Sequence, residues 1–234
     1  MIILGFDTTA VSVSAAVSED GRMLSMFTLN TPKNHGEMLL PMLDSQLRPL
    51  ELTLDDVGLY AVSVGPGSFT GVRVGTSLVK GLAYDGKPCA AVSSLEALAE
   101  NLAGIDGLVV PVMDARRSQL YTAIFRDGVR LMDDSLITAS ELNERLNKIG
   151  GPVRFVGDGY NVARSLITYP DIKDTPEIAR MQNAASVAAV GYRMYLAGNV
   201  TDAASLAPVY LRASQAERER NERLAAEKST ENQN

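Results

Sequence analysis

The sequence predicts an α/β protein in which one arrangement of strands and helices occurs twice, in residues 1–104 and in residues 105–212. The first reason is composition, because 46% of the 234 residues are hydrophobic and 21% are charged, as in chains with a packed core. The second is that short apolar runs alternate with segments of helical periodicity. The third is that three strands in hairpin order, followed by helix, strand and helix, begin again after Gly104.

Apolar patterns place the elements of the first half in order. Short apolar runs predict strands at 2–6, 12–17, 23–29, 59–64 and 89–92. Apolar residues recurring every three or four positions predict helices at 35–47, 72–84 and 95–103. Gly21 lies at the reversal between the second and third strands, and Ser93 or Ser94 is placed to cap the last helix.

The same patterns continue in the second half and then stop. Strands are predicted at 108–113, 119–125, 129–133 and 153–157, and helices at 139–149 and 183–196. Residues 213–234 form a charged C-terminal tail whose only large apolar side chain is Leu224. We expect this tail to be a solvated helix or disordered, and a partner-docking helix is the alternative.

Composition excludes several kinds of protein. Lys and Arg number 22 against 28 Asp and Glu, and a net charge of −6 argues against strong nucleic-acid binding by the chain alone, while local basic patches stay open. With Cys89 and His35 as the single cysteine and histidine, the chain can form neither an internal disulfide nor a metal site that needs two histidines. The first residues do not read as a signal peptide and no apolar run of about 18 residues occurs, so we expect a cytoplasmic protein without a membrane span.

The glycine-rich segment at residues 65–75 is the most distinctive motif. It follows a predicted strand and leads into a predicted helix, so its free backbone N–H groups would converge where an anion is favoured. We therefore take Gly65, Gly67 and Ser68 as candidate nucleotide-binding residues. The segment matches neither the P-loop nor the dinucleotide-binding glycine pattern. The structural alternative is a tight turn that requires glycine, with Phe69 inserted into the core.

Polar residues follow the first strand of each half. Asp7, Thr8 and Thr9 directly follow the first strand, and Asp114 occupies the corresponding place in the second half. A carboxylate and two hydroxyls at a strand end can hold Mg²⁺ and phosphate oxygens, so two such aspartates across a cleft would form a nucleotide site. Equally, these side chains can terminate the strand by hydrogen bonds to the backbone.

Four sequence segments together are distinctive: Ile-Leu-Gly-Phe-Asp-Thr at 3–8, Gly-Pro-Gly-Ser-Phe-Thr-Gly-Val-Arg-Val-Gly at 65–75, Asp-Ala-Arg at 114–116 and Pro-Val-Tyr-Leu-Arg at 208–212. With these segments the chain resembles the TsaB (YeaZ) family, which takes part in tRNA threonylcarbamoyladenosine biosynthesis in bacteria. The resemblance spans residues 1–212. It implies the actin-like ATPase fold, with two RNase H-like lobes built of mixed sheets flanked by helices.

The resemblance also implies a function. Proteins of this family support the addition of a threonylcarbamoyl group to the adenosine beside the anticodon of tRNAs, and are regarded as non-catalytic. A TsaD-like paralogue carries out the transfer with a TsaE-like ATPase, so we expect both as partners and contact with tRNA only through the complex. Whether the isolated chain forms a homodimer is left open by the resemblance. The alternative is an active nucleotide hydrolase or kinase of the same fold, while a metallopeptidase is disfavoured by the single histidine.

The chain departs from its catalytic relatives at two places. The TsaD-like paralogue has a two-histidine metal motif on its first-lobe helix, where this chain has His35 alone. Actin-like ATPases also have a glycine soon after each phosphate-loop aspartate, and none follows Asp7 or Asp114 closely here. We therefore expect weak or absent ATP hydrolysis and no required cofactor, with ATP or ADP and Mg²⁺ at a subunit interface left open.

The partner interface carried over from the family lies on the two helices predicted in the first half. Its candidate residues are His35, Met38, Leu39, Met42, Leu43, Val72, Arg73, Thr76, Val79 and Lys80. The apolar face of the helix at 35–47 is broader than one packing seam requires, which leaves room for an inward and a partner-facing side. From this spacing we expect Met42 to point outward.

Overall fold

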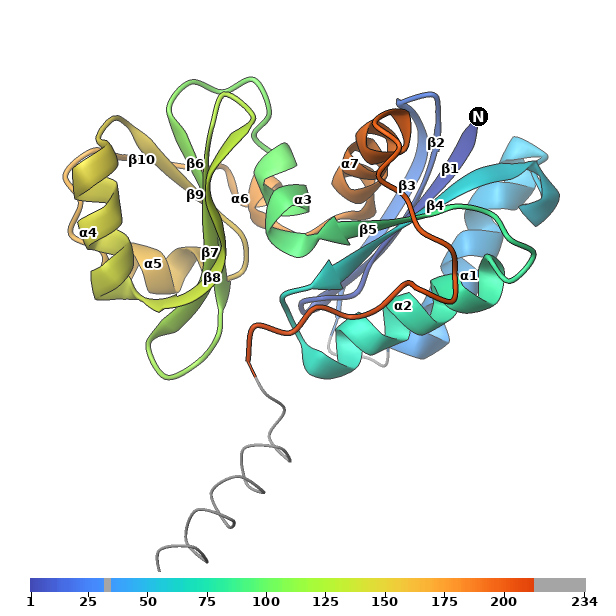
Figure 1. The fold of residues 1–234 in the computed structure, drawn as a ribbon, viewed down its shortest axis with the longest axis horizontal. Helices are drawn as coiled ribbons and strands as arrows, with labels where there is room; N and C mark the ends of the chain where they lie inside the picture. Colours follow the sequence, from blue (N-terminus) through green and yellow to red (C-terminus); the bar gives the residue numbers. More distant parts are fainter. Residues whose placement is uncertain (32–34, 213–234) are drawn as a thin grey trace, which may run out of the picture.

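The computed structural model describes residues 1–31 and 35–212, which form two lobes, each built around a five-stranded sheet (Figure 1). The first sheet has the spatial order β3-β2-β1-β4-β5. Its strands are β1 (Ile2–Asp7), β2 (Ser12–Glu19), β3 (Arg22–Asn30), β4 (Val57–Gly65) and β5 (Cys89–Ser93). Because β1 is antiparallel to β2 and parallel to β4, the sheet is mixed.

The second sheet repeats this arrangement. Its order is β10-β9-β6-β7-β8, and its central strand β6 is antiparallel to β7 and parallel to β9. The strands are β6 (Leu108–Asp114), β7 (Gln119–Arg126), β8 (Val129–Thr138), β9 (Val153–Val156) and β10 (Ile172–Lys173). The prediction of a duplicated α/β unit is therefore confirmed.

Helices cover both faces of the first sheet, and its central strands β1 and β4 are accordingly buried along nearly their whole length. On one face lie α1 (His35–Leu47) and α2 (Phe69–Leu82), which pack on Leu4 and Phe6. On the other lies α7 (Ala184–Leu196), which packs on Ile3. Successive side chains of β1 thus enter two separate cores.

The second sheet has an outer and an inner layer. α4 (Ala139–Ile149) and α5 (Tyr160–Leu166) cover its outer face, and α3 (Ser94–Glu100) packs on the inner face between the lobes (Figure 1). The short α6 (Glu177–Arg180) and the 3-10 turns Arg48–Leu50 and Leu54–Asp56 complete the elements of the described part. None of the described helices is long and apolar enough to cross a membrane.

Two C-terminal segments return to the first lobe. α7 follows the second sheet in the chain, yet it packs on the first, so a division at residue 104 does not separate the lobes in space. Residues 201–212, which we call the C-terminal strap, then run along the first lobe: Thr201 pairs with Cys89, and the Val209 amide donates to the Val64 carbonyl at 2.7 Å. The predicted tail at 213–234 lies outside the described residues.

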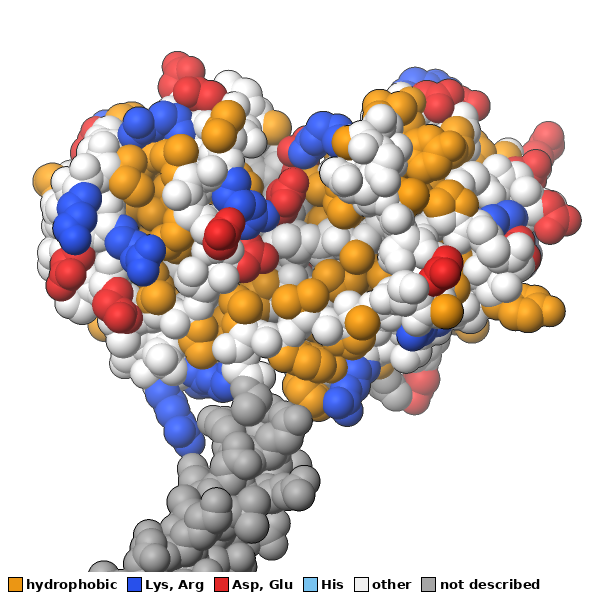
Figure 2. Space-filling view, viewed as in Figure 1, with side chains coloured by type: hydrophobic (Ala, Val, Ile, Leu, Met, Phe, Trp, Pro, Cys, Tyr) orange, Lys and Arg blue, Asp and Glu red, His pale blue; other side chains and the backbone are white. Residues whose placement is uncertain are grey.

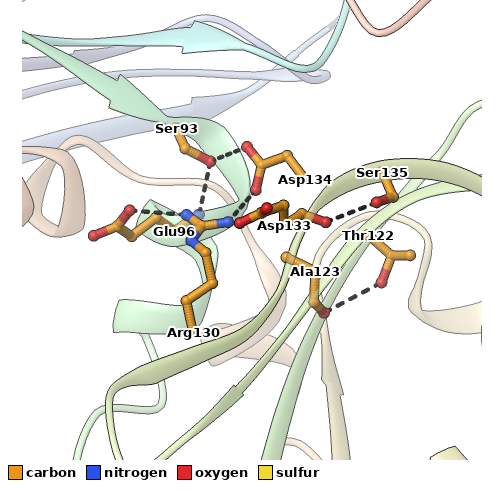
Figure 3. Close-up of polar contacts among 8 residues, drawn as sticks. All are labelled: Ser93, Glu96, Thr122, Ala123, Arg130, Asp133, Asp134 and Ser135. Carbon is orange, nitrogen blue, oxygen red and sulfur yellow. Dashed lines mark hydrogen bonds and ion pairs between the residues drawn. The ribbon is translucent and has the colours of Figure 1, made fainter. Parts of the chain in front are cut away.

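A polar cluster joins the lobes on the side of α3 (Figure 3). Arg130 of β8 donates one hydrogen bond to Asp134 and another, of 2.8 Å, to Glu96 of α3. Ser93, the N-cap of α3, donates to the other oxygen of Asp134 at 2.5 Å. One guanidinium therefore links carboxylates of both lobes, and all four side chains are partly shielded from water.

Candidate functional site

The residues that the sequence suggests as a nucleotide site meet only in part. A cavity of about 360 Å³ lies between the lobes. It is lined from the first lobe by Thr9, Gly67 and Ser68, and from the second by Asp114, Arg116 and Asp158. The structure thus brings together three candidate residues, Gly67, Ser68 and Asp114. The other three, Asp7, Thr8 and Gly65, do not line the cavity.

Asp7 is engaged within the first lobe. Its side chain is buried, and one carboxylate oxygen accepts hydrogen bonds from the Thr9 amide at 2.9 Å and the Thr9 hydroxyl at 2.8 Å. The other oxygen accepts from the Ser63 hydroxyl at 2.6 Å. Burial raises the pKa of Asp7 above its ordinary value, against the lowering effect of these hydrogen bonds. The carboxylate therefore fastens the turn after β1 to strand β4.

The glycine-rich segment packs directly on that turn. A Cβ atom on Gly71 would lie 1.9 Å from the Thr8 carbonyl oxygen, and one on Gly67 would lie 2.5 Å from the Thr9 carbonyl oxygen. The Thr8 hydroxyl donates to the Gly71 carbonyl at 2.7 Å. The Ser68 amide donates to the Thr9 carbonyl at 2.7 Å, so this N–H group of the predicted anion site is already hydrogen-bonded. Close backbone approach accounts for both glycines.

Asp114 differs from its counterpart Asp7 because it reaches the cavity. One of its oxygens accepts from the Arg116 amide at 2.8 Å, and the other pairs with the Arg116 guanidinium at 3.2 Å. Asp158 lies in the same cavity, and its pKa is raised, chiefly by loss of water around it and further by the charge of Asp114. The cavity lining therefore includes two carboxylates, one of which is paired with a guanidinium.

Phe69 does not enter the core as the structural alternative supposed. Its half-buried ring stacks on Tyr210 of the C-terminal strap with ring centroids 4.4 Å apart. The Arg73 guanidinium lies 3.9 Å from the centroid of Phe69, and its Nε donates to the Tyr210 hydroxyl at 2.9 Å. Sequence reasoning missed this cluster because Tyr210 is distant in the chain and carries no periodic signal.

The candidate interface residues divide between core and surface. Six are buried in the first lobe itself: Leu39, Met42, Leu43, Val72, Thr76 and Val79. The other four are His35, Met38, Arg73 and Lys80, of which the last two are exposed and the first two half-buried. Met42 is only 3% exposed, so the expectation that it points outward is wrong. The apolar side chain that α1 presents to solvent is Leu40, at 53% exposure.

His35, the single histidine, lies at the start of α1. Its Nε2 is 3.1 Å from the carbonyl oxygen of Val11, in the loop between β1 and β2. No group of three or more metal-ligating side chains occurs anywhere in the described chain.

Comparison with known proteins agrees with this architecture. A sequence model of the family described as "TsaD: tRNA N6-adenosine threonylcarbamoyltransferase" matches residues 29–220, more than half of the chain. The tRNA threonylcarbamoyladenosine biosynthesis protein TsaB of Bacillus subtilis is 33% identical over 172 residues, covering 71% of this chain and 75% of that protein. The Escherichia coli protein of the same name is 28% identical and covers 91% of this chain and 95% of its own length.

Solved structures show the same fold. YeaZ from Pseudomonas aeruginosa superposes with a TM-score of 0.76 at 23% identity, over 90% of this chain and 99% of that one. Component A of (R)-2-hydroxyglutaryl-CoA dehydratase from Acidaminococcus fermentans has a TM-score of 0.53 at 10% identity, covering 84% of this chain and 99% of that one. The fold is the actin-like arrangement of two lobes, and by its sequence the chain belongs to the TsaB (YeaZ) family.

Proposed function

We propose that this chain is a non-catalytic subunit of the complex that adds threonylcarbamoyl to the adenosine beside the anticodon of tRNAs. Membership in the TsaB family supports a role in tRNA threonylcarbamoyladenosine biosynthesis, because the relatives from Bacillus subtilis and Escherichia coli are named for that process. The observation that supports a non-catalytic role is the engagement of Asp7 by Ser63 and Thr9.

The chemistry of the cleft is consistent with this proposal. A magnesium–nucleotide complex needs carboxylate oxygens for the hydrated cation and free N–H groups for the phosphates. Both carboxylate oxygens of Asp7 already accept hydrogen bonds from within the chain. The Thr8 hydroxyl donates to the Gly71 carbonyl, and the Ser68 amide donates to the Thr9 carbonyl. We therefore propose that the chain needs no cofactor of its own. Any ATP or ADP with Mg²⁺ in the complex would be bound at a subunit interface.

The outer faces of α1 and α2 are the surface we propose for a TsaD-like paralogue. They present Leu40 and Lys80 to solvent, and Tyr84 just beyond α2 is 88% exposed. Exposed apolar side chains rimmed by charge are typical of protein interfaces. The same surface would support a homodimer of the isolated chain, and a TsaE-like ATPase would join the assembled pair.

Reconstitution with TsaD-like and TsaE-like subunits tests the proposal. We expect co-purification of the chain with the TsaD-like subunit and tRNA modification that is lost when the chain is omitted. The purified chain alone should show no metal-dependent ATP turnover above buffer. Substantial turnover by the chain alone, normalised to its concentration, would instead favour an actin-like hydrolase or kinase and refute the non-catalytic role.

A further inference from the structure

Four arginines of this acidic chain lie where the C-terminal strap passes from the first lobe to the second. They are Arg73 of α2, Arg116 and Arg117 of the loop between β6 and β7, and Arg212 of the C-terminal strap; we call them the arginine edge. Figure 2 shows Lys or Arg side chains on the lower edge of the molecule, on both sides of the point where the described chain ends.

Hydrogen bonds of the C-terminal strap link the segments that carry these arginines. Tyr210 and Arg212 are two residues apart on the strap. Tyr210 accepts a hydrogen bond from Arg73 in the first lobe. Arg212 donates to the Ala115 carbonyl at 2.6 Å and to the side chain of Gln119, on either side of Arg116 and Arg117 in the second lobe. The strap therefore contacts Arg73 directly and, through Arg212, the two ends of the loop that carries Arg116 and Arg117.

Carboxylates of the described residues compensate one of the four charges of this edge. Within residues 1–31 and 35–212, Asp114 forms an ion pair with Arg116, whereas no carboxylate pairs with Arg73, Arg117 or Arg212. The side chain of Arg116 is itself 85% exposed. In a chain of net charge −6, such a concentration of positive charge indicates an anionic partner.

The loop that carries two of these arginines has a costly backbone. Arg116, Arg117 and Ser118 have φ angles of 64°, 55° and 56°, in the left-handed region that side chains other than glycine rarely adopt. Such residues cost about 1 kcal/mol each or more and persist where surrounding contacts hold them. Here the contacts of Arg212 and Asp114 hold the loop, and both arginines project into solvent.

We propose that the arginine edge contacts the sugar–phosphate backbone of tRNA in the assembled complex, an inference that rests on the proposed function. Guanidinium groups bind phosphate oxygens bidentately, and several spread along an edge match a polymer of phosphates better than one terminal phosphate group. Tyr210, 38% exposed beside Arg73, adds an aromatic surface of the kind that contacts unpaired bases.

Charge-neutral variants of the loop test this proposal. Arg116→Gln with Arg117→Gln keeps side-chain length and removes two charges from the edge. The matched control is Arg145→Gln with Arg164→Gln, which removes two exposed charges from α4 and α5 on the outer face of the second lobe. Binding of labelled tRNA is titrated across a salt series, with the full chain alone at low salt and with the reconstituted complex.

We expect the loop variant to bind tRNA about tenfold more weakly and to lower the slope of log affinity against log salt by about 1.5, because roughly 0.7 to 0.9 of a counterion is released per phosphate contact. The control should match the wild type. Unchanged tRNA affinity and slope in the loop variant would overturn the proposal. So would an equal loss in the control, or weaker binding of MgATP or of a partner subunit with tRNA affinity unchanged.

This design separates the two proposals. Failure of the wild-type chain to join a TsaD-like subunit would refute the proposed function, while the titration of the full chain alone still measures the edge. A complex that assembles and modifies tRNA, but binds tRNA equally well with the wild-type chain and with the loop variant, would refute only the proposed tRNA contact of the arginine edge.

Discussion

Replacing Gly71 by alanine tests whether the glycine-rich segment is a packing element. The new methyl carbon would lie 1.9 Å from the Thr8 carbonyl oxygen, where real contacts stay beyond 3.0 Å. Either α2 or the turn after β1 must therefore move by about 1 Å, because the obstacle is a backbone atom and not a side chain that could change its rotamer. This movement would also stretch the 2.7 Å hydrogen bond from the Thr8 hydroxyl to the Gly71 carbonyl.

The expected loss follows from these contacts. Overpacking costs about 1–3 kcal/mol, with the upper end expected where backbone is the obstacle, and the weakened buried hydrogen bond adds about 1 kcal/mol. The higher helix propensity of alanine compared with glycine offsets about 1 kcal/mol of this loss. The free energy of unfolding should thus fall by about 3 kcal/mol, which lowers Tm by roughly 6–12 °C in a chain of this size.

Gly81 provides the matched control on the same helix. It lies near the end of α2, and an added Cβ would meet nothing within 4 Å. Gly81→Ala should therefore raise the free energy of unfolding by about 0.5 kcal/mol through helix propensity alone. Thermal unfolding followed by circular dichroism measures both variants. A Gly71→Ala protein as stable as the wild type, or equal losses in the two variants, would refute the packing role.

Three further predictions follow from single side chains. Met42→Asp should lower the free energy of unfolding by about 4 kcal/mol or more, because it buries an unpaired carboxylate. Leu40→Asp should change the free energy of unfolding by under about 1 kcal/mol and weaken binding of a TsaD-like subunit. Equal destabilisation of the two variants in urea melts would contradict this prediction. Burial raises the pKa of Asp7, so ionisation of this carboxyl group disfavours folding. The wild type should therefore lose stability relative to Asp7→Asn as the pH rises from the ordinary pKa of 3.8 through the pKa of the folded protein. A constant difference between the urea midpoints of the two proteins across this range would exclude a raised pKa. Burial raises the pKa of Cys89 to about 11, so iodoacetamide at pH 8 should label native protein far more slowly than protein in urea, and equal rates would place the thiol at the surface.

The local elements were predictable from the sequence where the pattern was long and periodic. The helices at 35–47 and 139–149 occur with the predicted bounds. α2 begins three residues earlier than periodicity alone indicated, because Ser68 caps it by accepting from the Gly71 amide at 3.2 Å. α5, α6 and β10 were missed, since segments of two to seven residues contain too few turns or alternations to show a period.

The candidate site depended on contacts between distant residues, which a single sequence does not supply. The sequence left Asp7 open between a cation ligand and a strand terminator. What favours the second role is the hydrogen bond from Ser63, on another strand. Likewise, helical spacing showed that α1 has a broad apolar face, but the position of the sheet decides that Met42 is inside and Leu40 outside.

The return of α7 to the first sheet has a consequence for synthesis on the ribosome. Gly191 of α7 approaches Ala61 so closely that an added Cβ would lie 2.5 Å from the alanine methyl group, and Ile3 and Leu59 are fully covered in the same cluster. A nascent chain that has finished β5 must therefore wait for about 90 more residues, roughly 5–20 s of translation, before that apolar layer is shielded. During this interval the growing polypeptide offers a hydrophobic target to chaperones, and a message truncated before codon 184 would yield a product unable to hide it.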